Sequence, residues 1–421
     1  MDEKISGRLG ALTPEQRALL EARVKKRRST VEPAAKAAWR QAEATASHLE
    51  KNSVAYRRTA GPRNLKFSLY FFSDDGCSSE SDKYKLLLEG AKFADNNGFC
   101  AIWTPERHFQ GFGGLYPNPS VVSAALAALT SRVQIRAGSV ALPLHHPVRV
   151  AEEWSVVDNL SHGRVAVSFA SGWHPDDFIF APAAYENRKE LMLEYIEKIQ
   201  KLWAGEEVVF NGAGNNSVPV RILPRPVQSS LPIWITTAGN PATWTRAGQI
   251  GANVFCALVG YSFDDLAERI SEYRKSRQEY GHDPDTGQVT VMLHTYIGDD
   301  EKVVKQVVRQ PMCSYLRSYF QQFQGLVQGS DQITEEDKMA IVARAFDSYY
   351  DESLLIGTSG KCERLADRLQ DAGVDELACL VDFGLSFDLV MEGLNRLAEL
   401  RTQFDHADNS AVLAAAPVEG D

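Results

Sequence analysis

Residues 133–170 read VQIRAGSVALPLHHPVRVAEEWSVVDNLSHGRVAVSFA, and this stretch decides the fold. Its two ends, 133–140 and 164–170, are apolar runs rich in β-branched residues, which predict buried strands. Between them, Pro147 opens a stretch of helical periodicity that ends near Gly163. Two strands joined by a helix run parallel, because the chain has to cross back over the sheet. The stretch therefore predicts one strand–helix–strand unit of a parallel sheet.

The same alternation continues on both sides of this unit. The predicted strands cover residues 65–71, 99–103, 133–140, 164–170, 232–237, 252–258, 289–297 and 376–382. The predicted helices begin near Ser81, Pro119, Pro147, Tyr185, Asn240, Phe263, Gly360 and Phe387. Eight strands, each followed by a helix, predict a closed parallel barrel of the α/β class, a (β/α)8 or TIM barrel. A doubly wound sheet is the competing fold, but its GxGxxG fingerprint is absent after the first strand.

The barrel pattern is expected to occupy residues 61–405, with other segments attached to it. Residues 1–60 are rich in Ala, Glu and Gln and predict a helical appendage of the linker or docking type. Two insertions are expected within the barrel, a hairpin near 205–230 and an aromatic, helical segment near 300–355. Such insertions serve as lids over a barrel's catalytic face or as oligomer interfaces, and the sequence favours neither. Residues 406–421 are expected to be a disordered tail.

Composition narrows the classes of function. The net charge is −10, and the basic run at 25–28 (KKRR) is best interpreted as the solvated face of a helix, so no nucleic-acid partner is expected. The six cysteines include no CxxC pair, and no metal site is predicted. The N-terminus has no apolar signal segment and no stretch reaches membrane-spanning length, which predicts a cytoplasmic protein.

The end of the second predicted strand carries the residues Glu106, Arg107, His108 and Phe109. A TIM barrel keeps its catalytic groups at the carboxyl ends of its strands, and a histidine can hold or relay a proton near neutral pH. Glu106, Arg107 and His108 are therefore the candidate catalytic residues. The alternative, which we weigh equally, is a structural Glu106–Arg107 ion pair beside a packed His108.

Polar residues that follow the third strand receive structural interpretations. His145 and His146 are adjacent, and neighbouring side chains on extended backbone point in opposite directions, so the pair is a poor metal chelate. Arg164 is expected to form an ion pair with Glu152 at the base of the barrel.

Two later strand ends suggest a ligand site. Gly172 permits close approach to the backbone, and Trp173 offers a flat apolar face for a ring system. The segment from Ala238 to Thr243 has small residues before a helix N-terminus, whose free N–H groups suit a phosphate. Any loop between a strand and a helix prefers small residues, so this signal is weak alone.

Together these residues resemble the bacterial-luciferase-like flavin-dependent monooxygenases, from Leu65 to about Arg401. The most specific matches are residues 106–109 (ERHF), 142–152 (LPLHHPVRVAE), 160–164 (LSHGR) and 238–240 (AGN), which occur in the family's order. Residues 168–178 (SFASGWHPDDF) and 236–241 (TTAGNP) resemble the subgroup associated with nonribosomal peptide and polyketide assembly lines. Residues 12–24 (LTPEQRALLEARV) are similar to linkers of those synthetases.

The resemblance implies particular roles. The FMN phosphate would meet Ala238, Gly239, Asn240 and Thr243, and the isoalloxazine ring would lie near Gly138, Ser139, Gly172 and Trp173, with a cis peptide bond between Gly138 and Ser139. Ser171 stands where luciferases have an arginine that pairs with the phosphate. Arg107 stands where they have the catalytic histidine, so His108 inherits that role as a hypothesis.

The implied reaction is oxygenation of an organic substrate by reduced FMN and O2 through a flavin C4a-(hydro)peroxide. A separate flavin reductase would supply the reduced FMN, an acyl or peptidyl carrier protein would present the substrate, and the protein would form homo-oligomers. One alternative is hydride transfer by a deazaflavin (F420)-dependent oxidoreductase. The other is a non-catalytic protein that binds flavin or a carrier.

Overall fold

The computed structural model describes residues 65–73, 82–258, 261–321 and 335–405. The predicted appendage (1–60) and tail (406–421) lie outside the described residues. Among the described residues, no helix is both long enough and apolar enough to cross a membrane.

Eight parallel strands form a closed barrel, as the sequence predicts. They are β1 (Lys66–Tyr70), β2 (Ala101–Thr104), β3 (Gln134–Ala141), β4 (Val165–Ala170), β7 (Ile233–Thr237), β8 (Asn253–Ala257), β9 (Val289–Ile297) and β11 (Glu376–Leu380). Each pairs with the next in this order, and β11 pairs with β1 to close the ring. All eight predicted strands are thus confirmed.

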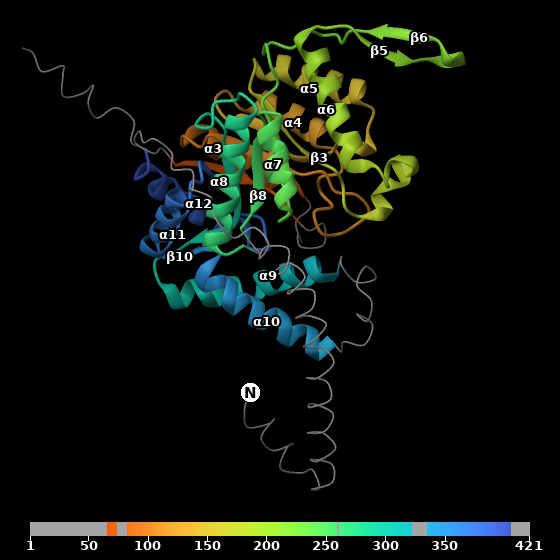
Figure 1. Ribbon diagram of the computed structural model, residues 1–421. Helices are drawn as coiled ribbons and strands as arrows, with labels where there is room; N and C mark the ends of the chain where they lie inside the picture. The colour runs from red at the N-terminus through yellow and green to blue at the C-terminus, as the bar shows by residue number, and fades with distance from the viewer. Residues whose placement is uncertain (1–64, 74–81, 259–260, 322–334, 406–421) are drawn as a thin grey trace, which may run out of the picture. The chain divides into compact units, whose positions relative to one another are not determined.

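Helices surround the barrel on its outer side (Figure 1). They are α3 (Lys85–Asn96), α4 (Pro119–Leu129), α5 (Pro147–Ser161), α6 (Arg188–Ala204), α7 (Pro241–Gln249), α8 (Phe263–Glu279), α11 (Ser359–Asp371) and α12 (Phe387–Thr402). Short 3₁₀ helices are η1 (Leu142–Leu144), η2 (Pro175–Phe180), η3 (Pro182–Ala184) and η4 (Ala213–Asn215). The N-cap side chains of Asn118 and Asn240 accept backbone hydrogen bonds at the starts of α4 and α7, where proline occupies the first helical position.

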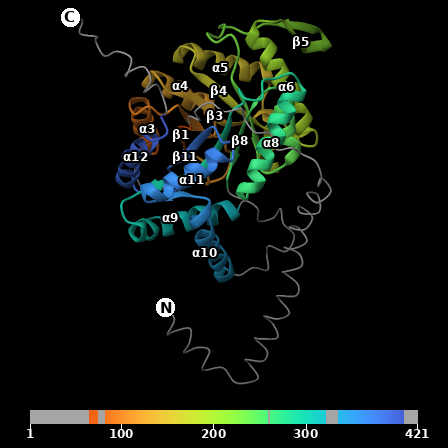
Figure 2. The same ribbon diagram turned by 60° about the vertical axis from the view of Figure 1, so that its left-hand side comes forward.

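Two segments are added to the eightfold repeat. β5 (Val208–Asn211) and β6 (Ser217–Val220) form an antiparallel hairpin that extends from the side of α5 and α6 (Figures 1 and 2). α9 (Glu301–Gln321) and α10 (Glu335–Glu352) lie next to each other between β9 and α11. A short strand, β10 (Leu355–Gly357), then pairs with β9.

The apolar core has two main parts. The larger part lies between the outer face of the barrel and its helices. The second part fills the barrel interior, where Tyr70, Trp103, Trp234 and Phe255 are buried, and it continues into buried side chains of α9 and α10. The α9–α10 pair therefore packs against the barrel interior.

A buried ion pair crosses the interior of the barrel. The Arg136 guanidinium lies between the rings of Trp103 and Trp234, at 4.8 and 4.5 Å from their centroids. It donates to Glu376 at 2.7 Å, and Glu376 also accepts from Ser68 at 2.6 Å. The pair ties β3 to β11 within the apolar interior.

The predicted ion pair between Arg164 and Glu152 is wrong. The Arg164 guanidinium instead donates to backbone carbonyls, including those of Val133 at 2.6 Å and Thr130 at 2.7 Å. Its Nη2 group donates to the Ala127 and Thr130 carbonyls at the end of α4, and its Nε donates to the Ser161 carbonyl at the end of α5. The role of Arg164 at the base of the barrel is therefore still structural.

Candidate active site

The predicted site residues lie along four neighbouring strands. Glu106, Arg107 and His108 follow β2, Gly138 and Ser139 lie within β3, residues 171–173 follow β4, and residues 238–240 follow β7. β2, β3, β4 and β7 are consecutive in the barrel. The structure therefore brings the candidate catalytic residues and the candidate cofactor residues to one side of the carboxyl-terminal mouth.

Glu106 binds two histidines with one oxygen atom. Its Oε1 lies 2.8 Å from His108 Nε2 and 2.6 Å from His145 Nε2, while Oε2 accepts from the backbone N–H of Ala141 at 2.8 Å. Burial alone would raise the pKa of Glu106. Hydrogen bonds from His108 and His145, and the charge of His145, lower it below its ordinary value. Glu106 is therefore a buried carboxylate that holds both imidazoles in place.

Arg107 belongs to a second group, formed with residues after β4. Its Nη1 lies 3.5 Å from Asp177 Oδ2, and its guanidinium carbon lies 5.1 Å from the ring centroid of Trp173. Burial lowers the pKa of Arg107 and raises that of Asp177, and the attraction between the two opposes both shifts. The salt-bridge partner of Arg107 is therefore Asp177 and not Glu106, which is the main departure from the structural alternative considered for this motif.

His108 lies among aromatic side chains. Its ring centroid is 4.8 Å from that of Phe180 and 5.5 Å from that of Phe109. Phe109 and Phe180 are themselves 59% and 54% exposed, although both are large and apolar. The imidazole thus combines a polar partner on one side with apolar rings that are open to the mouth.

The turn between β7 and α7 is open to solvent. Ala238, Gly239 and Asn240 are exposed, and Gly239 has φ +99°, a left-handed conformation suited to glycine. The Asn240 side chain accepts from the N–H of Ala242 at 3.0 Å, and Thr243 is half-buried on the first turn of α7. The exposed backbone and helix N-terminus form a neutral cradle that suits a phosphate.

The β3 backbone is closely packed at Gly138, two strands from the cradle. The peptide bond between Gly138 and Ser139 is cis, as the resemblance implies. Tyr70 donates its hydroxyl to the Gly138 carbonyl at 2.7 Å. A Cβ at Gly138 would lie 2.9 Å from the Trp103 ring, so the position requires glycine.

Residues on the opposite strands add polar groups that the sequence analysis did not select. His294 on β9 is buried, neither ring nitrogen has a hydrogen-bond partner among the described residues, and Tyr315 of α9 packs on its ring at 4.5 Å. Burial lowers the pKa of His294 to about 3. Asp382 after β11 accepts from the N–H of Phe72 at 2.7 Å, and burial raises its pKa to about 6.

The sequence pattern could have identified some of the additional site residues, His145, Asp177 and His294, more easily than others. The sequence analysis rejects His145 as a metal ligand and gives it a structural interpretation, although it follows β3, the strand next to the one that precedes Glu106. Asp177 falls in a 3₁₀ helix whose direction the sequence pattern does not specify. His294 shares one face of β9 with Thr290 and Met292, so strand alternation could have placed it inside the barrel.

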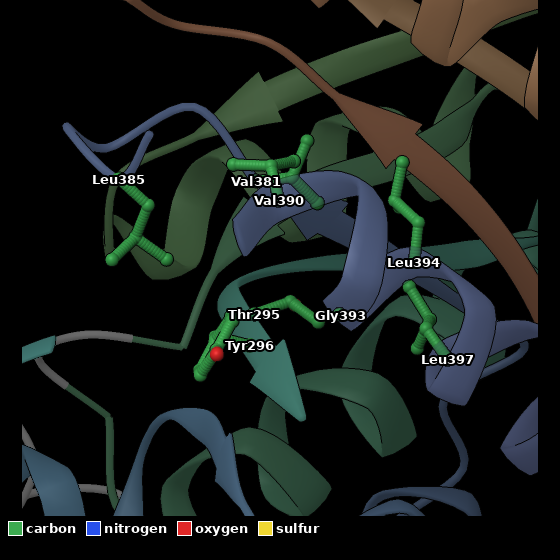
Figure 3. Close-up of a pocket in the computed structure, with 8 residues that line it drawn as sticks. All are labelled: Thr295, Tyr296, Val381, Leu385, Val390, Gly393, Leu394 and Leu397. Atoms are coloured by element: carbon green, nitrogen blue, oxygen red, sulfur yellow. The ribbon is translucent and has the colours of Figure 1, made fainter. Parts of the chain in front are cut away.

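A small cavity in the described part of the chain lies away from this site. It is an apolar space of about 10 Å³ between β9, β11 and α12. Figure 3 shows the residues that line it: Thr295, Tyr296, Val381, Leu385, Val390, Gly393, Leu394 and Leu397. A space of this size holds one water molecule at most, so we place the functional site by its chemistry and not by this cavity.

Comparisons with known proteins agree with the geometry. Residues 65–376 match the family model of luciferase-like monooxygenases. The oxygenase component of flavin-dependent trigonelline monooxygenase from Acinetobacter baylyi is 27% identical over 368 residues, which is 83% of this chain and 100% of that protein. The 4-hydroxyprotoasukamycin monooxygenase of Streptomyces nodosus subsp. asukaensis is 29% identical over 51% of this chain and 59% of its own length.

Solved structures show the same fold. Monooxygenase RslO1 from Streptomyces bottropensis has a TM-score of 0.67 at 25% identity, with 80% of this chain and 98% of that chain covered. The oxygenating constituent of 3,6-diketocamphane monooxygenase from Pseudomonas putida, solved with FMN, has a TM-score of 0.66 at 18% identity, with 81% and 98% covered.

The chain belongs to the luciferase-like monooxygenase family. It is an enzyme, a flavin-dependent monooxygenase built on a TIM barrel.

Proposed function

We propose that this enzyme uses reduced FMN and O2 to oxygenate an organic intermediate of natural-product biosynthesis while the intermediate is tethered to a carrier protein. Bound reduced FMN would supply the electrons that activate O2, so that one oxygen atom enters the substrate and the other leaves as water. The observation that carries the proposal is the exposed cradle at the start of α7, which follows β7. Trp173 follows the neighbouring strand β4, and the Arg107 guanidinium lies 5.1 Å from its ring.

The residues present fit FMN as the cofactor. The exposed N-terminus of α7 offers backbone N–H groups to the phosphate, and the exposed Trp173 offers an apolar face to the ring system. Ser171 gives the phosphate a hydroxyl where luciferases provide an arginine. We therefore propose reversible binding, in which reduced FMN is held more tightly than oxidised FMN and no covalent bond forms.

Substitutions in the cradle should weaken FMN binding. Thr243→Val removes one hydroxyl and is expected to reduce affinity by about 1–2 kcal/mol, roughly 5- to 30-fold. Asn240→Asp keeps an N-cap acceptor but adds a negative charge beside the phosphate, so it should reduce affinity at least as much with little change in stability. Isothermal titration with FMN measures both effects. Thr245→Val, two residues along the same helix, is the matched control, and equal losses in Thr243→Val and Thr245→Val would place the phosphate elsewhere.

His108 is proposed to hold or transfer a proton beside the flavin, with Arg107 and Glu106 in support. Its buried ring packs against the exposed rings of Phe109 and Phe180, and its Nε2 is bonded to Glu106. We expect His108→Ala to slow oxygenation by about 10²- to 10⁴-fold and to divert O2 into hydrogen peroxide, with FMN affinity nearly unchanged. Substrate-dependent O2 uptake and released peroxide measure the coupling. Full coupling in the variant would assign His108 a structural role and make Arg107 the better candidate for stabilising developing negative charge.

Two partners follow from this proposal. The trigonelline relative is an oxygenase component, which supports a separate reductase as the source of reduced FMN here. A carrier protein is supported by the resemblance of residues 168–178 and 12–24 to assembly-line sequences. Covalent delivery raises the effective concentration of a substrate, so it relaxes the need for a tight pocket. Residues 300–355 would admit the phosphopantetheine arm, with Tyr315 and Tyr319 of α9 near its entrance.

The deciding experiment compares three forms of one acyl substrate: the free acid, a simple thioester and the acyl carrier protein. Oxygenation by the reductase-coupled enzyme should be most efficient with the carrier-bound form. Equal efficiency with the free acid would end the carrier hypothesis. Deletion of residues 1–60 is expected to impair only the carrier-bound reaction if this segment docks the carrier. Anaerobic hydride transfer from reduced F420 would instead favour an F420-dependent enzyme.

A further inference from the structure

The two histidines on Glu106 differ in their access to water. The Glu106 side chain is 1% exposed, that of His108 is 10% exposed, and that of His145 is 35% exposed. An ionised carboxylate only accepts hydrogen bonds, so both imidazoles direct an Nε2–H toward Oε1. The Nδ1 atom of each ring is then the position at which a proton can be gained or lost.

The negative charge of the Glu106 carboxylate is not balanced by the Arg107–Asp177 pair. Arg107 and Asp177 form a separate pair of opposite charges at 3.5 Å and balance each other. A counter-charge stabilises a buried carboxylate, and the two imidazoles bonded to Glu106 are the groups that can carry one. His145 is the more exposed ring, and a positive charge there loses less hydration than a charge on His108.

We propose that His145 is a positioning residue for His108: by carrying the positive charge that balances Glu106, it keeps the His108 imidazole neutral, with its Nδ1 lone pair available to accept a proton. The consequence for the reaction rests on the proposed role of His108. The arrangement itself depends only on the three side chains and their distances. Without His145, the balancing proton would move to His108 and occupy that lone pair.

Other charged groups around the cluster support this assignment. His145 faces Glu106 and Glu153 of α5, and both carboxylates raise its pKa above the ordinary value against the opposing effect of burial. Glu153 is partly balanced by Arg149 at 2.7 Å. His108 lies near two carboxylates, Glu106 and Asp177. Asp177 also interacts with the charges of Arg107 and His174. Both carboxylates near His145 thus favour its protonated form.

The test is nitrogen-15 NMR of the histidine rings in the full-length protein without flavin, at about pH 7. In the wild type, His108 should show one protonated and one unprotonated ring nitrogen, and His145 should show two protonated nitrogens. His145→Gln keeps a hydrogen-bond donor for Glu106 but removes the charge. In this variant, both nitrogens of His108 should become protonated. An unchanged His108 pattern would overturn the proposal.

Two further variants separate charge from structure. His146→Gln changes the adjacent histidine, which packs 5.2 Å from the Phe210 ring and is the matched control that should leave His108 unaltered. His145→Lys restores a cation and should restore the wild-type His108 pattern. If His145→Lys behaves like His145→Gln, charge is not the cause and the proposal is wrong.

The catalytic consequence is tested separately. The pH profile of O2-dependent oxidation of reduced FMN should move toward higher pH in His145→Gln, because the neutral form of His108 is then reached only at higher pH. Full activity of His108→Ala would refute the proposed catalytic role of His108, yet the NMR patterns would still decide the charge arrangement. The two ideas can therefore fail independently.

Discussion

Replacing Glu376 with alanine is expected to lower the free energy of unfolding by about 3–5 kcal/mol, the usual loss when one partner of a buried ion pair is removed. Glu376 is fully buried, and its partner Arg136 is 3% exposed. Burial alone would raise the pKa of Glu376, but the charge of Arg136 and the hydrogen bonds of its neighbours lower it. Removal of the carboxylate leaves a guanidinium between two tryptophan rings without a counter-charge. Urea unfolding monitored by tryptophan fluorescence measures the loss.

The double variant Arg136→Met with Glu376→Leu separates two contributions to stability: the charge interaction of the ion pair and the packing of its side chains in the interior. It removes both charges, and Ser68 and Trp103 keep their mutual hydrogen bond of 3.0 Å. We therefore expect it to be more stable than either single variant. Glu194→Ala, which breaks the exposed pair with Lys198, is the surface control and should change stability by about 0.5 kcal/mol or less. A single variant at Glu376 as stable as this control would show that the interior pair contributes little.

The architecture could be predicted from sequence because it depends on periodicity. Alternating apolar runs and amphipathic stretches determine which segments are strands and which are helices, and parallel strands with helical crossovers leave few topologies. The same logic places residues 106–108, 171–173 and 238–240 at the mouth, since each follows a strand. These predictions do not depend on the orientation of individual side chains.

Side-chain partners could not be predicted in the same way. The structural alternative pairs Glu106 with its neighbour Arg107, but Glu106 binds His145, which is 39 positions away. Adjacent residues on a bent loop point in different directions. The hydrogen-bond partner of Glu106 therefore comes from the loop that follows the neighbouring strand, β3. Asp177 reaches Arg107 from a 3₁₀ helix after β4, whose path depends on local packing. Partner choice therefore depends on loop conformation, which a strand-and-helix pattern does not encode.

Replacing His294 with phenylalanine is expected to make the protein markedly more resistant to acid. Burial lowers the pKa of His294 to about 3, so the folded state holds a neutral imidazole. In the unfolded chain the imidazole has an ordinary pKa of about 6.5 and binds a proton as the pH falls. Because the unfolded state then binds more protons, stability rises with pH between about 3 and 6.5 and is lost as the pH falls through this range. At about pH 5, this linkage destabilises the wild type by roughly 2 kcal/mol relative to neutral pH.

His294→Phe removes that linkage and also removes two buried ring nitrogens that have no hydrogen-bond partner among the described residues. Near neutral pH, we therefore expect equal or greater stability, because a phenyl ring can keep the packing against Tyr315 and Phe383 without a desolvation penalty.

Urea unfolding at several pH values measures the free energy of unfolding of the wild type and of His294→Phe. Both proteins contain the same carboxylates, so the effect of carboxylate titration cancels in the difference between the two free energies. His162→Asn changes an exposed histidine in left-handed backbone, a conformation that asparagine tolerates, and is the control. If wild type and His294→Phe lose stability in parallel between about pH 7 and pH 5, the imidazole is not held neutral in the barrel. A widening difference would show that the folded barrel keeps a neutral, destabilising imidazole in its interior.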